Sequence, residues 1–186
     1  MIINFVTSNK NKVREFKEIL GDRVKLNHIE IEYPELRSDD PEEIARLAAK
    51  QLAEKLGKKV VVEDSGLFIK ALNGFPGTSS AYIHKRIGLK GILRLMKGIK
   101  DREAMYMTAI GYCEPGKNPI SFLGVEKGRI ADKIRGGYGF GHDPIFISDG
   151  SRKTFGEMKD AEKIKKFRRR AVMQLLKYLQ KSATMG

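Results

Sequence analysis

The sequence predicts an α/β fold, a mixed sheet with flanking helices arranged in two lobes. Three observations carry this prediction: strands and helices alternate in the first half of the chain, a cluster of strands follows, and a helix ends it. The 186 residues are enough to bury a core. Because no stretch has the composition of a linker, we expect residues 1–186 to form one domain of two lobes.

In the first half, strands are expected at residues 2–6, 24–31 and 60–62, where apolar residues alternate with polar ones or run continuously. A helix with three apolar residues at helical spacing lies between the first two strands. A second helix begins at the N-cap Asp40, with proline at its first position, and ends at Gly57.

The second half predicts more strands than helices. A short helical stretch is expected at residues 91–96, and a long C-terminal helix from about residue 160 places Ile164, Phe167 and Leu175 on one side. Strands are expected at residues 104–113, 120–126, 129–134 and 144–147.

Composition limits the function classes. The net charge of +13 favours polyanionic partners, either nucleic acid or phosphorylated small molecules, although a charge excess is also typical of a solvated surface. One cysteine, Cys113, excludes internal disulfides and fits a reducing cytoplasm. The apolar runs are too short to cross a bilayer, and the N-terminus has the pattern of a strand and not of a signal peptide. We therefore expect a cytoplasmic protein without a membrane partner.

The segment Glu63-Asp64-Ser65-Gly66 follows a buried strand. A strand that ends in carboxylates delivers them to the carboxyl edge of the sheet, where α/β proteins bind ligands. Neighbouring side chains on extended backbone point opposite ways, so one of Glu63 and Asp64 is expected to face the ligand. An aspartate there can hold Mg²⁺ or activate a water, and it can equally cap the following turn.

A polar loop lies between the first strand and the first helix. A helix N-terminus offers free N–H groups and a positive dipole end to a phosphate, and the loop adds lysines, a hydroxyl and amides. It lacks the glycines of a Walker A motif, and a helix cap with two surface lysines is the alternative interpretation. The candidate phosphate-binding residues are Thr7, Ser8, Asn9, Lys10, Asn11 and Lys12.

A glycine-dense segment, residues 136–143, predicts backbone that bends sharply or approaches a ligand closely. Phe140 can stack on a base, and Asp143 or nearby backbone can contact the base edge. His142 has no companion His or Cys at metal-ligand spacing, so it is not assigned to a metal. A glycine-rich hairpin without a ligand is the alternative.

A basic run begins the C-terminal helix. Such runs usually form a solvated face, and in some proteins they bind RNA. The apolar residues among them prevent all six cations from pointing one way. The run consists of Lys163, Lys165, Lys166, Arg168, Arg169 and Arg170.

These blocks, in this order, resemble the inosine triphosphate pyrophosphatase family of non-canonical purine nucleotide pyrophosphatases. The resemblance spans nearly the whole chain and rests on four blocks in register. They are Thr7-Ser8-Asn9-x-x-Lys12; Glu63-Asp64-Ser65-Gly66-Leu67 with Leu72-Asn73-Gly74-Phe75-Pro76-Gly77; Gly137-Tyr138-Gly139-Phe140-Gly141-His142-Asp143-Pro144; and Thr154-Phe155-Gly156-Glu157-Met158 with Glu162-Lys163 and Arg168-Arg169.

The resemblance implies an elongated sheet with a substrate cleft between two lobes, working as a homodimer, and hydrolysis of ITP, dITP and XTP to the monophosphate and pyrophosphate. It makes Asp64 the catalytic acid–base group and, with Glu35, the Mg²⁺ ligand. Residues from Thr7 to Lys12 would hold the triphosphate, and Ser65 would touch the substrate. The nucleotide and its base would contact Phe140, Gly141, His142, Asp143, Lys163, Arg168 and Arg169.

The chain departs from the family pattern at three places, of which the mildest is Glu63, where a frequent Asp is replaced with the charge kept. Tyr often stands in place of His142, and Ser-His-Arg commonly stands in place of Phe167-Arg168-Arg169, so the base contact carries over to Arg169 more directly than to Arg168. Two other functions and a structural role remain open from sequence. A structural or scaffolding role would leave the three loop motifs without a purpose. A pyrophosphatase for modified pyrimidine or methylated nucleotides would keep the chemistry and change the pocket. An RNA-binding protein would explain the charge but give no purpose to the carboxylates, so a nucleic-acid partner is not expected.

Overall fold

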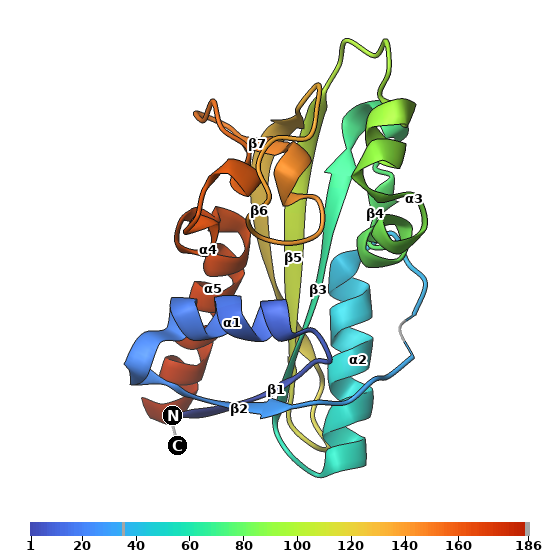
Figure 1. The fold of residues 1–186 in the computed structure, drawn as a ribbon. Coiled ribbons are helices and arrows are strands. Elements are labelled where there is room, and N and C mark those ends of the chain that lie inside the picture. The colour runs from blue at the N-terminus through green and yellow to red at the C-terminus, as the bar shows by residue number, and fades with distance from the viewer. Residues whose placement is uncertain (35, 185–186) are drawn as a thin grey trace. The chain divides into compact units, whose positions relative to one another are not determined.

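The computed structural model describes residues 1–34 and 36–184, and its strands form one mixed sheet (Figure 1). The sheet order is β2-β1-β3-β5-β6-β7, with β4 paired to β3. β1 runs parallel to β2 and β3, whereas β4 and β7 run antiparallel to β3 and β6. This confirms the predicted mixed α/β class. The strands are β1 (Ile2–Val6), β2 (Lys25–Ile29), β3 (Val60–Ile69), β4 (Pro76–Gly77), β5 (Glu103–Cys113), β6 (Ile120–Ile130) and β7 (Phe146–Ser148).

Helices flank the strands, and local chemistry explains where they begin and end. The Asp40 carboxylate accepts the N–H of Glu42 at 2.8 Å and caps α2, and Gly57 ends that helix in the left-handed conformation. No helix in the described ranges is long and apolar enough to span a bilayer. The helices are α1 (Lys10–Leu20), α2 (Pro41–Leu56), α3 (Ser80–Leu95), α4 (Ala161–Ile164) and α5 (Lys166–Thr184).

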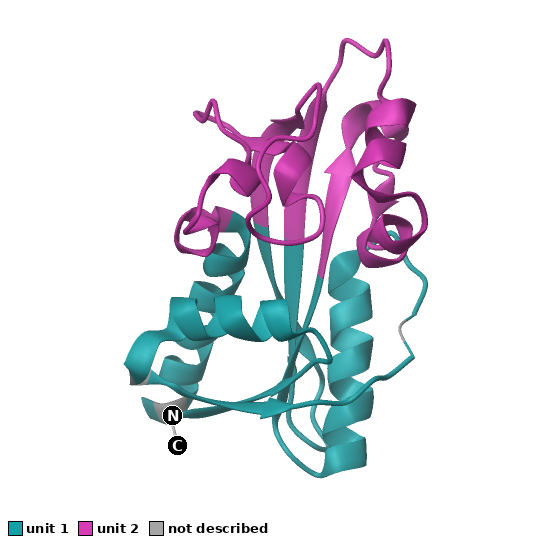
Figure 2. Ribbon diagram, viewed as in Figure 1, with its two compact units in different colours: residues 1–64, 108–124, 167–186 teal, residues 65–107, 125–166 magenta. Residues whose placement is uncertain are grey.

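The chain divides into two compact units, coloured separately in Figure 2. Unit 1 comprises Met1–Asp64, Thr108–Gly124 and Phe167–Gly186. Unit 2 comprises Ser65–Met107 and Val125–Lys166. The chain passes from unit 1 into unit 2 between Asp64 and Ser65, within β3, so the predicted carboxylate segment contributes residues to both.

Unit 1 packs helices against both faces of its strands. Phe5 and Val61 lie in one core cluster with α1 and α5, and the Phe5 ring stacks on Phe16 at 4.0 Å. Their neighbours Val6 and Val60 lie in a second cluster with α2. The alternation of side chains along each strand therefore distributes apolar residues to two helical layers.

Unit 2 has its own aromatic core. The Tyr106 ring lies 4.7 Å from Phe146, and the Phe146 ring lies 5.4 Å from Phe155. Leu67 and Ile69 of β3 are fully buried within the same unit. This core underlies the segment that carries the glycine-dense loop.

Three sequence expectations are corrected. β3 does not end at Val62 but continues to Ile69, because β4 pairs with Leu67 and Phe68, so Glu63 and Asp64 lie inside the strand. Residues 120–130 form one strand, because pairing with β7 continues to Ile130. The C-terminal helix is interrupted at the non-helical Lys165, and Ile164, expected in the apolar stripe, is exposed.

Candidate active site

The polar loop after β1 is held by its own side chains. The N–H of Asn9 donates to the Thr7 hydroxyl at 3.1 Å, and the Asn9 side-chain oxygen accepts the N–H groups of Asn11 and Lys12 at 3.0 and 3.3 Å. Two of the free N–H groups at the start of α1 are thus already bonded. An anion would meet the exposed Ser8 hydroxyl and the exposed Lys10 ammonium.

Lys12 joins this loop to the carboxylate segment. Its Nζ donates to the main-chain carbonyl of Glu63 at 2.8 Å, across fifty-one positions of sequence. Asp64, the next residue, is buried with 5% exposure. Unit 1 therefore places a fixed cation of the predicted phosphate loop beside the predicted catalytic aspartate.

Glu63 belongs to a buried ionic cluster, here named the Arg168 cluster and made of Arg168, Glu63 and Glu15. Arg168 donates from Nε and Nη2 to Glu63 Oε1 at 3.0 and 2.8 Å, and from Nη1 to Glu15. Thr108 also donates to Glu63 Oε1, at 2.9 Å. Burial lowers the pKa of Arg168 to about 9, so the guanidinium is still charged at neutral pH. The cluster therefore fixes the Glu63 side chain through its Oε1 atom.

The donors around Asp64 suit a hard cation. Mg²⁺ needs only one or two carboxylates and completes its shell with waters and substrate phosphates. Glu63 Oε2 is buried without a hydrogen-bond partner in the described part of the chain. No three His, Cys, Asp or Glu side chains come together as a metal cage within residues 1–34 and 36–184. Glu35, the other predicted ligand, lies outside the described residues.

The glycine-dense loop of unit 2 is organised around Asp143. Its Oδ2 accepts the N–H of Phe140 at 2.8 Å and pairs with Lys165 Nζ at 2.7 Å. Lys165 Nζ also lies 4.8 Å from the centre of the Phe140 ring. Burial raises the pKa of Asp143, and the Lys165 charge opposes that rise.

His142 is packed against a second histidine. Its ring centre lies 5.1 Å from that of His84 on α3, and the rings meet edge to face. His142 is 3% exposed, and burial, with a smaller effect of His84, lowers its pKa to about 4. The side chain is therefore neutral at physiological pH.

The remaining predicted residues are more accessible. Lys163 on α4 is exposed and lies 3.7 Å from the Asp160 carboxylate. Arg169 on α5 and Ser65 on β3 are half-buried, as is Gly141. Unit 1 thus holds the loop from Thr7 to Lys12, Asp64, Arg168 and Arg169, and unit 2 holds Ser65, the segment from Phe140 to Asp143, and Lys163.

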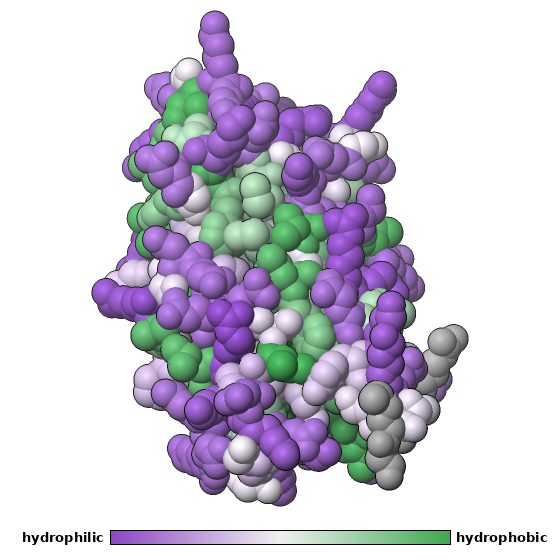
Figure 3. Space-filling model, turned by 180° about the vertical axis from the view of Figure 1, so that it is seen from behind, coloured by the Kyte–Doolittle hydropathy of each residue, from purple (hydrophilic) through white to green (hydrophobic). Residues whose placement is uncertain are grey.

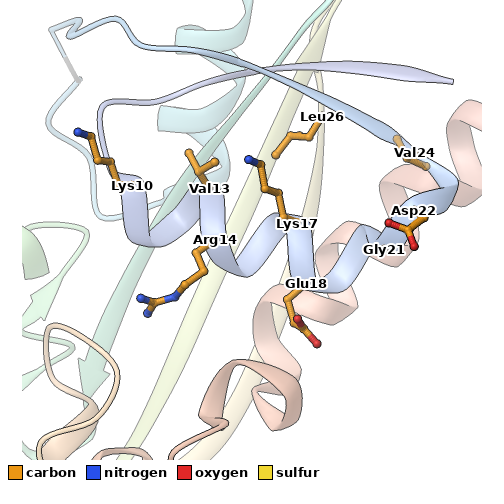
Figure 4. A pocket seen from close by; sticks show the side chains of 9 residues that line it. All are labelled: Lys10, Val13, Arg14, Lys17, Glu18, Gly21, Asp22, Val24 and Leu26. Carbon is orange, nitrogen blue, oxygen red and sulfur yellow. The ribbon is translucent and has the colours of Figure 1, made fainter.

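A pocket of about 740 Å³ lies beside α1 and β2 in unit 1 (Figure 4). Three of its cations, Lys10, Arg14 and Lys17, come from α1, and Glu18 and Asp22 add acidic charge. Figure 4 shows Arg14 and Glu18 pointing to one side of α1 while Val13, Lys17 and Leu26 lie on the side toward β2. Of the predicted site residues, the pocket lining contains Lys10.

Sequence reasoning missed the buried partners of these residues. Glu15 lies four positions before Ile19, on the apolar face of α1. An acidic residue on an apolar helix face was the one feature of the sequence that could have indicated a buried ion pair. Lys165 and His84 carry no comparable pattern, because their partners are far away in sequence. Burial of Lys165 and Arg168 also removes two cations from the basic run that an RNA partner would need.

The chain is similar to several known proteins in sequence and in fold. The chain is 49% identical over 166 residues to a dITP/XTP pyrophosphatase of Methanopyrus kandleri, covering 89% of this chain and 88% of that protein. It is 48% identical to a dITP/XTP pyrophosphatase of Methanosarcina mazei, covering 95% and 96% of the two chains. The Ham1 protein of Staphylococcus aureus has a similar structure, with a TM-score of 0.81, 30% identity and coverage of 96% and 99%. A HAM1 protein from Coxiella burnetii gives a TM-score of 0.82 at 28% identity, with the same coverage. The sequence model of the Ham1 family matches residues 3–178, and this chain belongs to that family.

Proposed function

We propose that this protein hydrolyses non-canonical purine nucleoside triphosphates, ITP, dITP and XTP, to the monophosphate and pyrophosphate. The observation that carries the proposal is the bond from Lys12 to the Glu63 carbonyl, which brings a phosphate-loop cation to the strand of Asp64. Relatives that carry the name dITP/XTP pyrophosphatase at 48–49% identity support the substrate class.

The triphosphate binds the loop from Thr7 to Lys12, with Lys12 and Lys163 neutralising the pyrophosphate that leaves. Asp64 and Glu35 would hold Mg²⁺, and the bound ion would supply charge neutralisation at the phosphate oxygens. The support for this metal is the buried Asp64 carboxylate on the strand that Lys12 contacts, because carboxylate oxygens suit a hard cation.

Asp64 takes a proton from the attacking water. The water oxygen forms a bond to the α-phosphorus, and the bond from that phosphorus to the bridging oxygen breaks. Pyrophosphate carries away the electron pair, and the monophosphate keeps the new oxygen. Lys12, already held beside Asp64, needs no large movement to meet the developing charge.

Base selection uses hydrogen-bond donors. Hypoxanthine and xanthine present an acceptor at O6, where adenine presents an amino donor. Donors from Arg169 and from main-chain N–H groups near Phe140 bind that acceptor, while the Phe140 ring stacks on the base. ATP would leave these donors unpaired, which can reduce turnover by about a thousandfold or more. The shape of the pocket rejects the 2-amino group of GTP.

Pyrophosphate release from ITP, XTP, GTP and ATP, each with and without Mg²⁺, tests the proposal. We expect fast release from ITP and XTP that requires Mg²⁺, and little from GTP and ATP. Asp64→Asn serves as the matched inactive variant, and an active Asp64→Asn would remove Asp64 from its role. Equal release from all four nucleotides would refute base selection but keep the metal and phosphate chemistry. No release from any would favour a modified-nucleotide substrate, and salt-sensitive RNA affinity without turnover would favour an RNA-binding function.

We propose that the enzyme is a cytoplasmic homodimer. The support for a partner copy is that large apolar side chains are exposed on α3, Tyr82 at 58% and Leu95 at 47%. Figure 3 shows hydrophobic patches among the hydrophilic side chains on one face of the molecule. The single, buried Cys113 fits a reducing compartment. Light scattering after size exclusion would give twice the 21.0 kDa chain mass for a dimer, and the chain mass itself would refute it.

A further inference from the structure

Lys165 is a cation in an unusual place. It lies between α4 and α5, and its side chain is 2% exposed. Lysine is almost never fully buried unless it is paired, because removing an ammonium group from water is costly. Its Nζ lies 2.7 Å from Asp143 Oδ2, and the ring centres of Phe140 and Phe155 lie 4.8 and 5.6 Å away. The Asp143 carboxylate and two aromatic rings therefore take the place of the water molecules that would hydrate an exposed ammonium group.

The same carboxylate holds the loop main chain. Asp143 Oδ2 accepts the N–H of Phe140 at 2.8 Å, and the Tyr106 hydroxyl donates to Oδ1 at 3.5 Å. Gly139 has φ +75°, and a side chain added there would collide with the Asp143 carboxylate. The loop thus wraps closely around Asp143, and the position of that carboxylate decides where Phe140 stands.

Lys165 is linked to Phe140 in two ways, to its backbone through Asp143 and to its ring by direct contact. Without the lysine charge, burial would favour the protonated form of Asp143, which is a weaker acceptor for the Phe140 N–H. The Phe140 ring would also lose the cation near its centre. Every one of these contacts lies inside unit 2.

We propose that Lys165 is a positioning residue for base selection: through Asp143 it sets the position of the Phe140 ring, which stacks on the purine, and of the neighbouring main-chain N–H groups that read the purine O6. The inference rests on the proposed function and names a residue that the proposed mechanism does not use. Its effect falls on discrimination between bases and not on phosphate chemistry, because Lys165 contacts the base-reading loop. Lys163, two positions earlier, is exposed and remains assigned to phosphate.

Four variants of the full chain test this role. Lys165→Met keeps the length and removes the charge, and Lys165→Arg restores the charge. Lys165→Met with Asp143→Asn removes both charges and leaves no buried charge unpaired. Lys159→Met is the matched control, because Lys159 is an exposed lysine near α4 with no part in the site. For each variant, kcat and KM for ITP and ATP would be measured, with IMP and AMP affinity by calorimetry and folding by circular dichroism.

We expect Lys165→Met to lower the ITP-over-ATP ratio of kcat/KM about tenfold or more, mainly by raising KM for ITP, because the loop reads O6, where adenine differs from hypoxanthine. IMP affinity should fall in parallel, while AMP affinity changes little. Lys165→Arg should recover most of the ratio, and Lys159→Met should match the wild type. If Lys165→Met does not fold, the double variant takes its place, with the same loss of discrimination expected.

A folded Lys165→Met, or double variant, with wild-type discrimination would overturn the inference. An equal fall in kcat for both nucleotides with an unchanged ratio would also overturn it, since that is the result of a merely structural role. A wild-type protein that releases no pyrophosphate is a separate outcome, because it refutes the proposed function before any variant is compared.

Discussion

The Arg168 cluster gives the strongest prediction about stability. Arg168→Met removes a guanidinium that is 1% exposed and leaves the carboxylates of Glu15 and Glu63, whose side chains are 2% and 0% exposed, buried together. An exposed ion pair contributes at most about 1 kcal/mol, but removing one partner of a buried pair costs about 3–5 kcal/mol. Because Arg168 and both of its carboxylate partners are buried, we expect the larger loss in the free energy of unfolding. For a chain of this size it corresponds to a Tm lower by about 6–20 °C.

Thermal and guanidinium unfolding, each followed by far-UV circular dichroism, would measure this loss. The chain has two compact units, so coincident transitions by both methods are needed before a free energy is calculated. Arg14→Met is the control, because Arg14 lies exposed on α1 and its loss should change stability by less than about 0.5 kcal/mol. Adding Glu63→Gln to Arg168→Met removes one of the two buried carboxylates that have lost the arginine, and it should restore part of the stability.

A decrease of less than about 1 kcal/mol in the unfolding free energy of Arg168→Met, as expected for an exposed arginine, would show that the buried ion pairs do not stabilise the fold. A double variant less stable than Arg168→Met would contradict the claim that unpaired buried charge causes the loss. Both results can be read from the same unfolding curves.

Other predictions concern catalysis, binding, packing and pH. Asp64→Asn should lower pyrophosphate release from ITP by about a thousandfold or more without lowering Tm, and normal turnover would contradict it. Lys12→Met should raise KM for ITP about tenfold, because it removes the cation held at the Glu63 carbonyl; an unchanged KM would separate Lys12 from the triphosphate. Gly124→Ala should destabilise unit 1 by about 1–3 kcal/mol, because an added Cβ collides with the Phe167 carbonyl, whereas Gly137→Ala meets open space and should be nearly neutral in unfolding experiments. Burial lowers the pKa of His142 to about 4 in the folded protein, below its ordinary 6.5, so the unfolded chain binds more protons between these pH values. The stability that the neutral His142 contributes is therefore complete above pH 6.5 and is lost as the pH falls toward 4. Between pH 6.5 and pH 4 the unfolding free energy of His142→Phe should therefore fall by about 3 kcal/mol less than that of the wild type. An unchanged pH profile would show that another group titrates there.

The order and type of most elements follow from local sequence. Asp40 and Gly57 bound α2 because capping depends on the residues at the helix ends, and alternating apolar residues select the strands. The boundaries that sequence placed wrongly depend on distant pairing: β3 extends past Asp64 because β4 returns beside it. The functional residues remain predictions from the family resemblance, and the structure adds their local geometry.

The sequence by itself determined the α/β class, the polar loop after β1 and the family to which the chain belongs. It could not determine which charges are buried, because the cost of burying a charge depends on a partner that local sequence does not name. Arg168 and Lys165 stand within one basic run, yet the first pairs with Glu15 and Glu63 in unit 1 and the second with Asp143 in unit 2. Only the tertiary structure brings those carboxylates within bonding distance, and it thereby separates these two cations from the solvated face that their sequence pattern predicts.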